Sequence, residues 1–325
     1  MTLEQVLDRF DGPERSVVVV NRTDPDPVLN MLVDTFGDDA IRVVDGRAVG
    51  DPADRPATDG AGPAGVDRDL GLTARDLTTA GDDGGRTDLS LDVEVLRRRD
   101  DIPFDGSDPA DIENLVLLME DDEVVAGSTL AELGDAVLFV NSDLYVTGSR
   151  SLGDVDLPSV ISGLDDATFT LRGYPESNRQ KLLLITISRF IERTAWTAGE
   201  GTLRSSFQQL SRIDDEVGTR EVYERVSGTG VDTHLYGVAD ELPADLDAVI
   251  HAGDGRDFTD SWFVVYRPPG GPRPVETEPD SDLQRGVEGG VALLAVETEP
   301  RIWRGLWTFD AERISRVNRY VERNL

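Results

Sequence analysis

A predicted helix that begins near Ser177 and ends at Gly199 constrains the fold more than any other segment of the chain. Large apolar side chains cover most of its circumference: Leu182, Leu183, Leu184, Ile185, Ile187, Phe190 and Ile191. Ser177 and Gln180 have the spacing of an N-terminal capping box, and a glycine such as Gly199 commonly ends a helix. Because a helix that is apolar on most sides is buried, other elements must pack against it on at least two sides.

The chain before this helix is predicted to form an N-terminal α/β module, residues 1–172. Its first 45 residues alternate between helical and strand patterns: a helix marked by Leu3, Val6, Leu7 and Phe10, a strand at 16–20, a helix at 28–36 and a strand at 41–44. Residues 45–111 are rich in Asp, Gly, Pro, Ala, Thr and Arg and have almost no apolar periodicity. Such a composition buries too little apolar surface to offset the entropy of ordering, so it predicts a flexible acidic insertion.

A β-hairpin is predicted where apolar residues return. Apolar runs at 115–119 and 124–126 flank four consecutive acidic residues, as in two strands joined by a polar turn. Ser128 is the expected N-cap of a short helix that follows. The remaining patterns of this module predict a strand at 137–140, a short helix at 157–164 and a strand at 167–171.

The residues after the central helix predict a mixed sheet. A polar segment at 202–213 and a helix at 220–226 precede five strand-like runs: THLYG, AVIHA, WFVVYR, VALLAVE and RGLWTF. A last helix, 311–324, follows Asp310, which is a favourable N-cap residue. The fold class is therefore α/β: the N-terminal module is followed by a second domain, residues 173–325, whose mixed sheet packs on helices.

Charge is the strongest compositional signal. Acidic residues outnumber basic ones by 64 to 32, for a net charge of −32, and Lys181 is the only lysine among the basic residues. Acidity spread over the whole chain, with almost no lysine, is typical of cytoplasmic proteins from salt-accumulating, haloarchaeal cells. In molar salt the Debye length falls to about 3 Å, which screens the self-repulsion of such a chain.

The same composition excludes several kinds of protein. The chain has no cysteine, so it has no disulfide, thiolate metal site or cysteine nucleophile. A nucleic-acid surface would need a basic stripe, which the chain lacks. No apolar run approaches the roughly 18 residues of a membrane span, and the amphipathic start MTLEQVLDRF does not have the pattern of a signal peptide. We expect a soluble, cytoplasmic protein.

Residues 182–325 resemble the DICT domain, a sensory module of signalling proteins. The matching segments are ISRFIERTAW, SSFQQLSRI, GTREVYERV, VDTHLYGVAD, SWFVVYR, ALLAVETEP and the closing RGLWTFDAERISRVNRYV. Residues 105–181 are similar to the extension of haloarchaeal DICT proteins. The resemblance implies sensing of a ligand or a protein partner. DICT domains often accompany a catalytic or DNA-binding output module, but this sequence has no such motif, so the expected output is a protein contact.

Lys181 leads to the first group of candidate ligand-binding residues. On a helix, Ser188 and Arg189 share the face of Lys181, and together they form a polar stripe that suits a polar or anionic ligand. The structural alternative is an ion pair of Lys181 with Glu192, Glu176 or an aspartate of the N-terminal module. Because arginine makes bidentate contacts better, a retained lysine indicates a confined site that accepts only an ammonium group.

A second group of candidates lies in the polar segment that follows. Ser206, Phe207 and Gln208 form an aromatic-centred polar strand with a possible ligand role, and hydrogen bonding at a sheet edge is the alternative. His234 and His251 fall in neighbouring strand-like runs, where they could lie side by side, but no metal-binding motif contains them. Trp262 is expected in the core or in a cleft wall.

We therefore expect a non-catalytic sensory or regulatory protein, without a cofactor, that recognises a small polar ligand or a protein partner. The sequence contains no nucleophile elbow, P-loop or dinucleotide-binding glycine motif. An enzyme that uses polar residues of the C-terminal domain, and a purely structural interaction module, are the alternatives.

Overall fold

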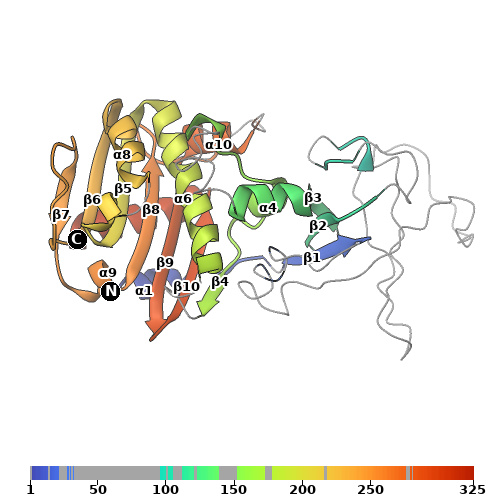
Figure 1. Ribbon diagram of the computed structural model, residues 1–325, viewed down its shortest axis with the longest axis horizontal. Helices are drawn as coiled ribbons and strands as arrows, with labels where there is room; N and C mark the ends of the chain where they lie inside the picture. Colours follow the sequence, from blue (N-terminus) through green and yellow to red (C-terminus); the bar gives the residue numbers. More distant parts are fainter. Residues whose placement is uncertain are drawn as a thin grey trace, which may run out of the picture.

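The residues that the computed structural model describes form two sheets and the helices packed against them (Figure 1). The structure describes residues 2–13, 15–21, 28, 30, 32, 96–99, 102–104, 112–120, 123–138, 152–172, 178–215, 218–275, 279 and 281–325. The predicted helix at 28–36 is described only at residues 28, 30 and 32, which are helical. The predicted strand at 41–44, most of the predicted insertion at 45–111 and the predicted cap Ser177 lie outside the described residues.

The smaller sheet is antiparallel and has the order β1-β2-β3. Its strands are β1 (Arg15–Val20), β2 (Leu115–Glu120) and β3 (Glu123–Thr129). The β2–β3 pair confirms the hairpin that was predicted around the four acidic residues. Val18 of β1 is paired with Leu117 of β2, and both side chains are buried because the strands have an apolar core on this side.

A helix occupies the place of one predicted strand. Residues 130–138 form helix α4, so the strand predicted at 137–140 is wrong at its first two residues. Leu130, Leu133 and Val137 are all buried, and their spacing of three and four is helical. The cap also differs, because Thr129, not Ser128, exchanges hydrogen bonds with Glu132 at 2.8 and 3.1 Å. These two bonds form a capping box, which starts the helix one residue later than predicted.

The larger sheet has seven strands in the order β4-β10-β9-β8-β5-β6-β7. The strands are β4 (Phe169–Arg172), β5 (Glu200–Gln209), β6 (Gly230–Val238), β7 (Val249–Ala252), β8 (Ser261–Arg267), β9 (Val291–Glu299) and β10 (Ile302–Thr308). The pairs β5–β6 and β6–β7 are parallel, and the other four pairs of this sheet are antiparallel. The predicted mixed sheet packed on helices is confirmed, and β5 is the strand at which the parallel and antiparallel parts meet.

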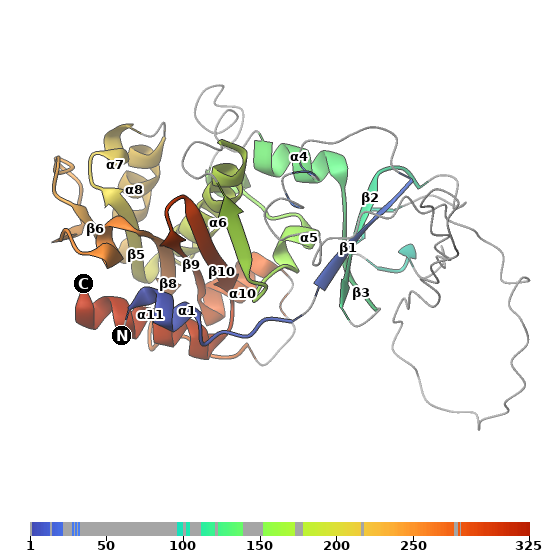
Figure 2. The same cartoon turned by 90° about the horizontal axis from the view of Figure 1, so that it is seen from below.

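Helices cover both faces of the larger sheet (Figure 2). The helical elements are α1 (Leu3–Leu7), η4 (Leu152–Asp154), α5 (Ser159–Ser162), α6 (Asn178–Ala198), α7 (Arg212–Asp215), α8 (Thr219–Ser227), α9 (Arg256–Thr259), α10 (Asp282–Gly289) and α11 (Ala311–Asn324). Asp310 caps α11 as predicted, because its side chain accepts a hydrogen bond from the Arg313 amide. No helix in the described part of the chain is long and apolar enough to cross a lipid bilayer.

Helix α6 is the central helix that the sequence predicts. Leu184 and Ile191 are fully inaccessible to solvent, and Leu183, Ile187 and Phe190 are nearly so. β5, β8 and β9 contact the helix on the sheet side, whereas α4, α8 and α10 contact it elsewhere. The expected cover on at least two sides is therefore present.

Helices α1 and α11 cover the opposite face of the larger sheet, although they lie at opposite ends of the sequence (Figure 2). Leu7 and Val317 from these helices share a buried cluster with Phe263 and Leu294 of the sheet. The Arg304 guanidinium is also 3.0 Å from the carboxylate of Asp8. The division into domains at residues 172 and 173 stays a prediction, and the chain's first helix packs on the larger sheet.

Candidate functional site

The candidate site begins with an irregularity at the carboxyl end of β5. β5 pairs with β8 only over 202–205, and its register with β6 shifts between Ser206 and Gln209. Gln208 has a φ of +58°, a left-handed conformation that is uncommon for a residue other than glycine. The strand therefore turns away from β8 before it ends.

Side chains of β5 replace the backbone pairing that is lost there. The Phe263 amide donates to Ser206 Oγ at 2.7 Å, and Gln208 Nε2 donates to the Ser261 carbonyl at 3.1 Å. These bonds satisfy the backbone of β8 where the ladder has ended. They also fix the two polar side chains beside helix α6.

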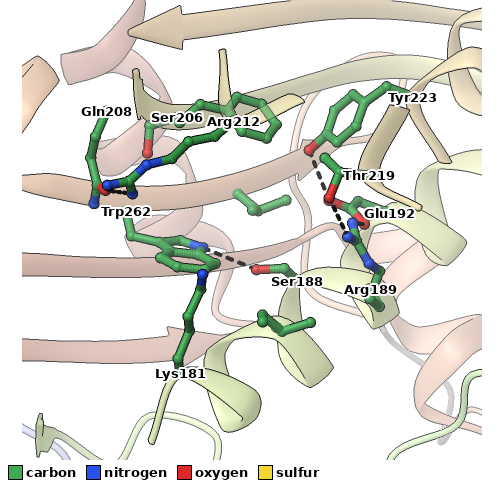
Figure 3. A pocket seen from close by; sticks show the side chains of 13 residues that line it. Lys181, Ser188, Arg189, Glu192, Ser206, Gln208, Arg212, Thr219, Tyr223 and Trp262 are labelled. Atoms are coloured by element: carbon green, nitrogen blue, oxygen red, sulfur yellow. Dashed lines mark hydrogen bonds and ion pairs between the residues drawn. The ribbon is translucent and has the colours of Figure 1, made fainter. Parts of the chain in front are cut away.

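A cavity of about 60 Å³ lies between this bulge and helices α6 and α8 (Figure 3). That volume holds several water molecules or a small ligand. Its walls come from α6, β5, α7, α8 and β8: Lys181, Ile185, Ser188, Arg189, Glu192, Ser206, Phe207, Gln208, Arg212, Thr219, Tyr223, Trp262 and Val264. All six residues that the sequence suggests for a ligand site are on this wall, so the structure brings the two candidate groups together. Their binding of a ligand stays a prediction.

A buried ion pair forms one end of the cavity. The guanidinium Nη1 of Arg189 lies 2.6 Å from Glu192 Oε2, and the two side chains are only 7% and 3% exposed. Arg189 Nη2 donates to Thr219 Oγ1 at 2.7 Å, and the Tyr223 hydroxyl donates to Glu192 Oε1 at 2.8 Å. Burial, and then the nearby Glu192 carboxylate, raise the pKa of Tyr223 well above its ordinary value, so its hydroxyl keeps its proton.

The other end of the cavity carries Lys181, Arg212 and Trp262 (Figure 3). The Trp262 indole N–H donates to Ser188 Oγ at 3.1 Å, which sets the plane of the ring. Arg212 Nη1 donates to Gln208 Oε1, so the bulge of β5 orients this guanidinium. Lys181 extends its side chain toward Trp262, and it is half-buried rather than enclosed as the sequence suggested.

The charge of this wall is opposite to that of the whole chain. Among the described residues of the wall, Lys181, Arg189 and Arg212 are cations and Glu192 is the one carboxylate, for a net charge of +2. The chain as a whole carries −32. Cations gathered in a partly water-excluded cavity attract an anion more strongly than the same charges on an open surface.

The sequence did not predict that α7 and α8 contribute residues to the cavity wall. Arg212 follows β5 directly, whereas Thr219 and Tyr223 come from the helix of the crossover between the parallel strands β5 and β6. Thr219 and Tyr223 are four residues apart and therefore on one face of α8, which was the available signal. Glu192 was expected as a possible partner of Lys181, but its two oxygens accept from Arg189 and Tyr223. Trp262, expected in the core or a cleft wall, lies in the wall.

The two histidines lie side by side in neighbouring strands, as the sequence indicated. His234 Nδ1 is 2.9 Å from His251 Nε2, and His234 Nε2 is 2.9 Å from Asp232. The His251 ring also stacks on Tyr236 with 4.3 Å between the ring centroids. Burial, and then the neighbouring His234, lower the pKa of His251. Among the residues that the structure describes, no three histidine or acidic side chains are placed to hold a metal ion.

Comparison with known proteins assigns no family to this chain. No protein-family model matches it, and no curated protein sequence matches it significantly. Among solved structures, the crystal structure of polyphosphate kinase from Porphyromonas gingivalis matches with 14% identity and a TM-score of 0.28. The match covers 51% of this chain and 25% of the kinase chain, so the chain spans about a quarter of the length of that relative. A similarity this weak carries no argument about fold or function, and the resemblance to DICT domains stays a prediction from the sequence.

Proposed function

We propose that this protein is a non-catalytic sensory or regulatory protein that binds a small anionic ligand in the cavity between α6, β5 and α8. The observation that carries the proposal is the net charge of +2 on the described residues of the cavity wall, in a chain with a net charge of −32. In a chain so acidic, a wall whose described residues include three cations and one carboxylate differs in charge from the chain as a whole. An anion is the ligand that complements it.

Preorganisation of the wall supports binding. Arg189 is held by Glu192 and Thr219, Arg212 by Gln208, and the Trp262 ring by Ser188. Side chains that are already held lose little further freedom when a ligand arrives, which lowers the cost of binding. The wall also combines aromatic and aliphatic side chains with these polar groups, as most small-molecule sites do.

The place of α6 in the fold supports a regulatory role. This helix supplies five residues of the cavity wall and also contacts α4, the helix that follows the small sheet. A ligand that changes the position of α6 would therefore change contacts at some distance from the cavity. The resemblance to DICT domains favours the same role, with a protein partner as the output.

A binding screen in molar KCl tests the proposal. The full chain is mixed with acetate, lactate, succinate, phosphate and sulfate, and the melting temperature and the chemical fate of each compound are measured. We expect one or more anions to raise the melting temperature and to be recovered unchanged. Turnover of the compound would favour the enzyme alternative, and no response to any anion would contradict the proposed ligand class.

Two charge-matched variants make the screen specific. Arg212→Gln removes one cation from the cavity wall, and we expect it to weaken binding by roughly tenfold or more because a charge-assisted hydrogen bond is lost. Arg256→Gln removes one cation from an exposed position, where the side chain is 76% accessible. Equal effects of the two variants would show that overall charge, not the cavity, governs the response.

A further inference from the structure

The only lysine of the chain lies in the wall of its cationic cavity. Lys181 is the single lysine among 32 basic residues, and the other two cations of the wall are arginines. Either side chain supplies a positive charge, so charge alone gives no reason for a lysine at this position. What an amine can do and a guanidinium cannot is attack a carbonyl carbon in its neutral form and keep that carbon in an imine.

We propose that Lys181 captures a small 2-oxo carboxylate as a reversible imine. This inference rests on the proposed anion-binding function and specifies its ligand class. The neutral amine of Lys181 adds to the ketone carbon, and the adduct then loses water. The oxygen of that water is the former ketone oxygen, and its two hydrogens come from the amine. A carbon–nitrogen double bond remains, no electrons are gained or lost, and water reverses the step.

Arg212 is placed to hold the carboxylate of such a ligand. It lies at the same end of the cavity as Lys181 in Figure 3, and Gln208 orients its guanidinium. Gln208 is in turn fixed by the Ser261 carbonyl, at 3.1 Å from its Nε2. A planar guanidinium whose direction is already set suits a carboxylate, which it can contact through two parallel hydrogen bonds.

The rest of this end suits a flat and small ligand. A 2-oxo acid and its imine are planar at the reacting carbon, and the ring of Trp262, fixed by Ser188, is a flat wall toward which Lys181 extends. A volume of about 60 Å³ admits a molecule of a few heavy atoms. Pyruvate is therefore a suitable probe.

Reductive trapping tests the proposal with the full chain in molar KCl. The protein is incubated with pyruvate and cyanoborohydride, which reduces an imine to a stable amine, and the products are mapped by peptide mass spectrometry. Besides Lys181, the α-amino group is the only other primary amine, and peptide mapping separates the two positions. We expect one carboxyethyl group on the peptide that contains Lys181, and none on that peptide in Lys181→Arg.

Three controls decide what an adduct means. Arg212→Gln should slow trapping at Lys181 by about tenfold or more, since it removes the carboxylate partner, whereas Arg256→Gln should trap like the wild type. The protein unfolded in urea at the same pH measures the intrinsic reactivity of Lys181. Equal trapping in the folded and the unfolded protein would overturn the proposal.

Lactate separates failure of this inference from failure of the proposed function. It has the carboxylate and size of pyruvate but no ketone carbon. If lactate raises the melting temperature and pyruvate leaves no adduct on Lys181, the imine is refuted and the anion site stands. If no anion of the screen raises the melting temperature and pyruvate leaves no adduct on Lys181, both proposals fail.

Discussion

The buried pair of Arg189 and Glu192 allows a sharp prediction about stability. Glu192→Leu removes the carboxylate that lies 2.6 Å from the Arg189 guanidinium, and it leaves that cation almost fully buried. Removing one partner of a buried ion pair costs about 3–5 kcal/mol, because the other charge stays out of water without compensation. We expect the free energy of unfolding of Glu192→Leu to fall by about this amount.

The double variant Arg189→Met/Glu192→Leu should recover most of that loss. In the double variant neither position 189 nor position 192 carries a charge that must be desolvated. Replacing a whole buried pair by apolar residues is often neutral or stabilising by roughly 1–4 kcal/mol. The two substitutions should therefore couple strongly. Tyr223 loses its acceptor in both variants, so this contribution is the same in each.

Helix α8 provides a control pair with the same distance. Arg225 and Glu221 are also 2.6 Å apart, but their side chains are 42% and 56% exposed. An exposed pair contributes about 0–1 kcal/mol, so Glu221→Leu should change stability by no more than this. Burial is then the variable that separates the two pairs.

Urea unfolding at a fixed molar KCl concentration, followed by circular dichroism, measures all four proteins. Urea is preferred to guanidinium chloride because it does not change the ionic strength. The reasoning is refuted if Glu192→Leu unfolds within about 1 kcal/mol of the wild type, or if the double variant is as unstable as the single one. Either result would mean that water in the cavity solvates Arg189.

Three further predictions concern other parts of the molecule. Asp310→Ala should lower the free energy of unfolding by about 1 kcal/mol, because the carboxylate accepts from the Arg313 amide at 2.8 Å at the start of α11; no change in urea unfolding would contradict this. The melting temperature should rise from low to molar KCl, since salt screens the repulsion within a chain of net charge −32, and a flat profile would refute the salt-adaptation hypothesis. The Ser211 hydroxyl donates to Asp240 at 2.6 Å and lowers the pKa of that carboxyl to about 2. A carboxyl whose pKa falls on folding stabilises the folded state above its unfolded-state pKa and loses this effect as the pH falls through the folded value. The difference in free energy of unfolding between wild type and Ser211→Ala should therefore be largest above the ordinary pKa of 3.8 and should vanish toward pH 2. Urea titrations at several pH values measure this difference, and a difference that does not change with pH would contradict the prediction.

Long and strongly periodic segments were predictable from the sequence. The apolar pattern of α6 predicted a helix buried on several sides, because burial follows directly from which faces are apolar. The apolar runs on either side of four acidic residues predicted the β2–β3 hairpin. The strand prediction at 137–140 was wrong at its first two residues because a short apolar run fits a strand or a buried helix equally well. The helical spacing is visible only when Leu130, Leu133 and Val137 are considered as one set.

The sequence predicted two separate groups of candidate site residues, but it did not predict that they line the same cavity. The polar stripe of α6 and the polar segment of β5 each suggested ligand contacts, and the structure places both on one wall. Nothing local predicts that β5 pairs with β8, which follows it by more than fifty residues, or that Gln208 takes a left-handed conformation there. Arg212 and Tyr223 enter the wall only because of that pairing and the crossover to β6. Pairing between strands that are far apart in the chain is the feature that is hardest to predict from a single sequence.

The shared position of α1 and α11 has a consequence for how the chain is made. One face of the larger sheet is finished only when the last helix, α11, has left the ribosome and joined α1, which was synthesised about 300 residues earlier. At roughly 5–20 residues per second, α1 waits on the order of 15–60 s for this partner. Phe263 and Leu294 are made within the last part of that interval, and from then until α11 docks the sheet face that carries them lacks its full cover. Chaperone access to α1 and to this sheet face during synthesis is therefore expected to affect the yield of folded protein.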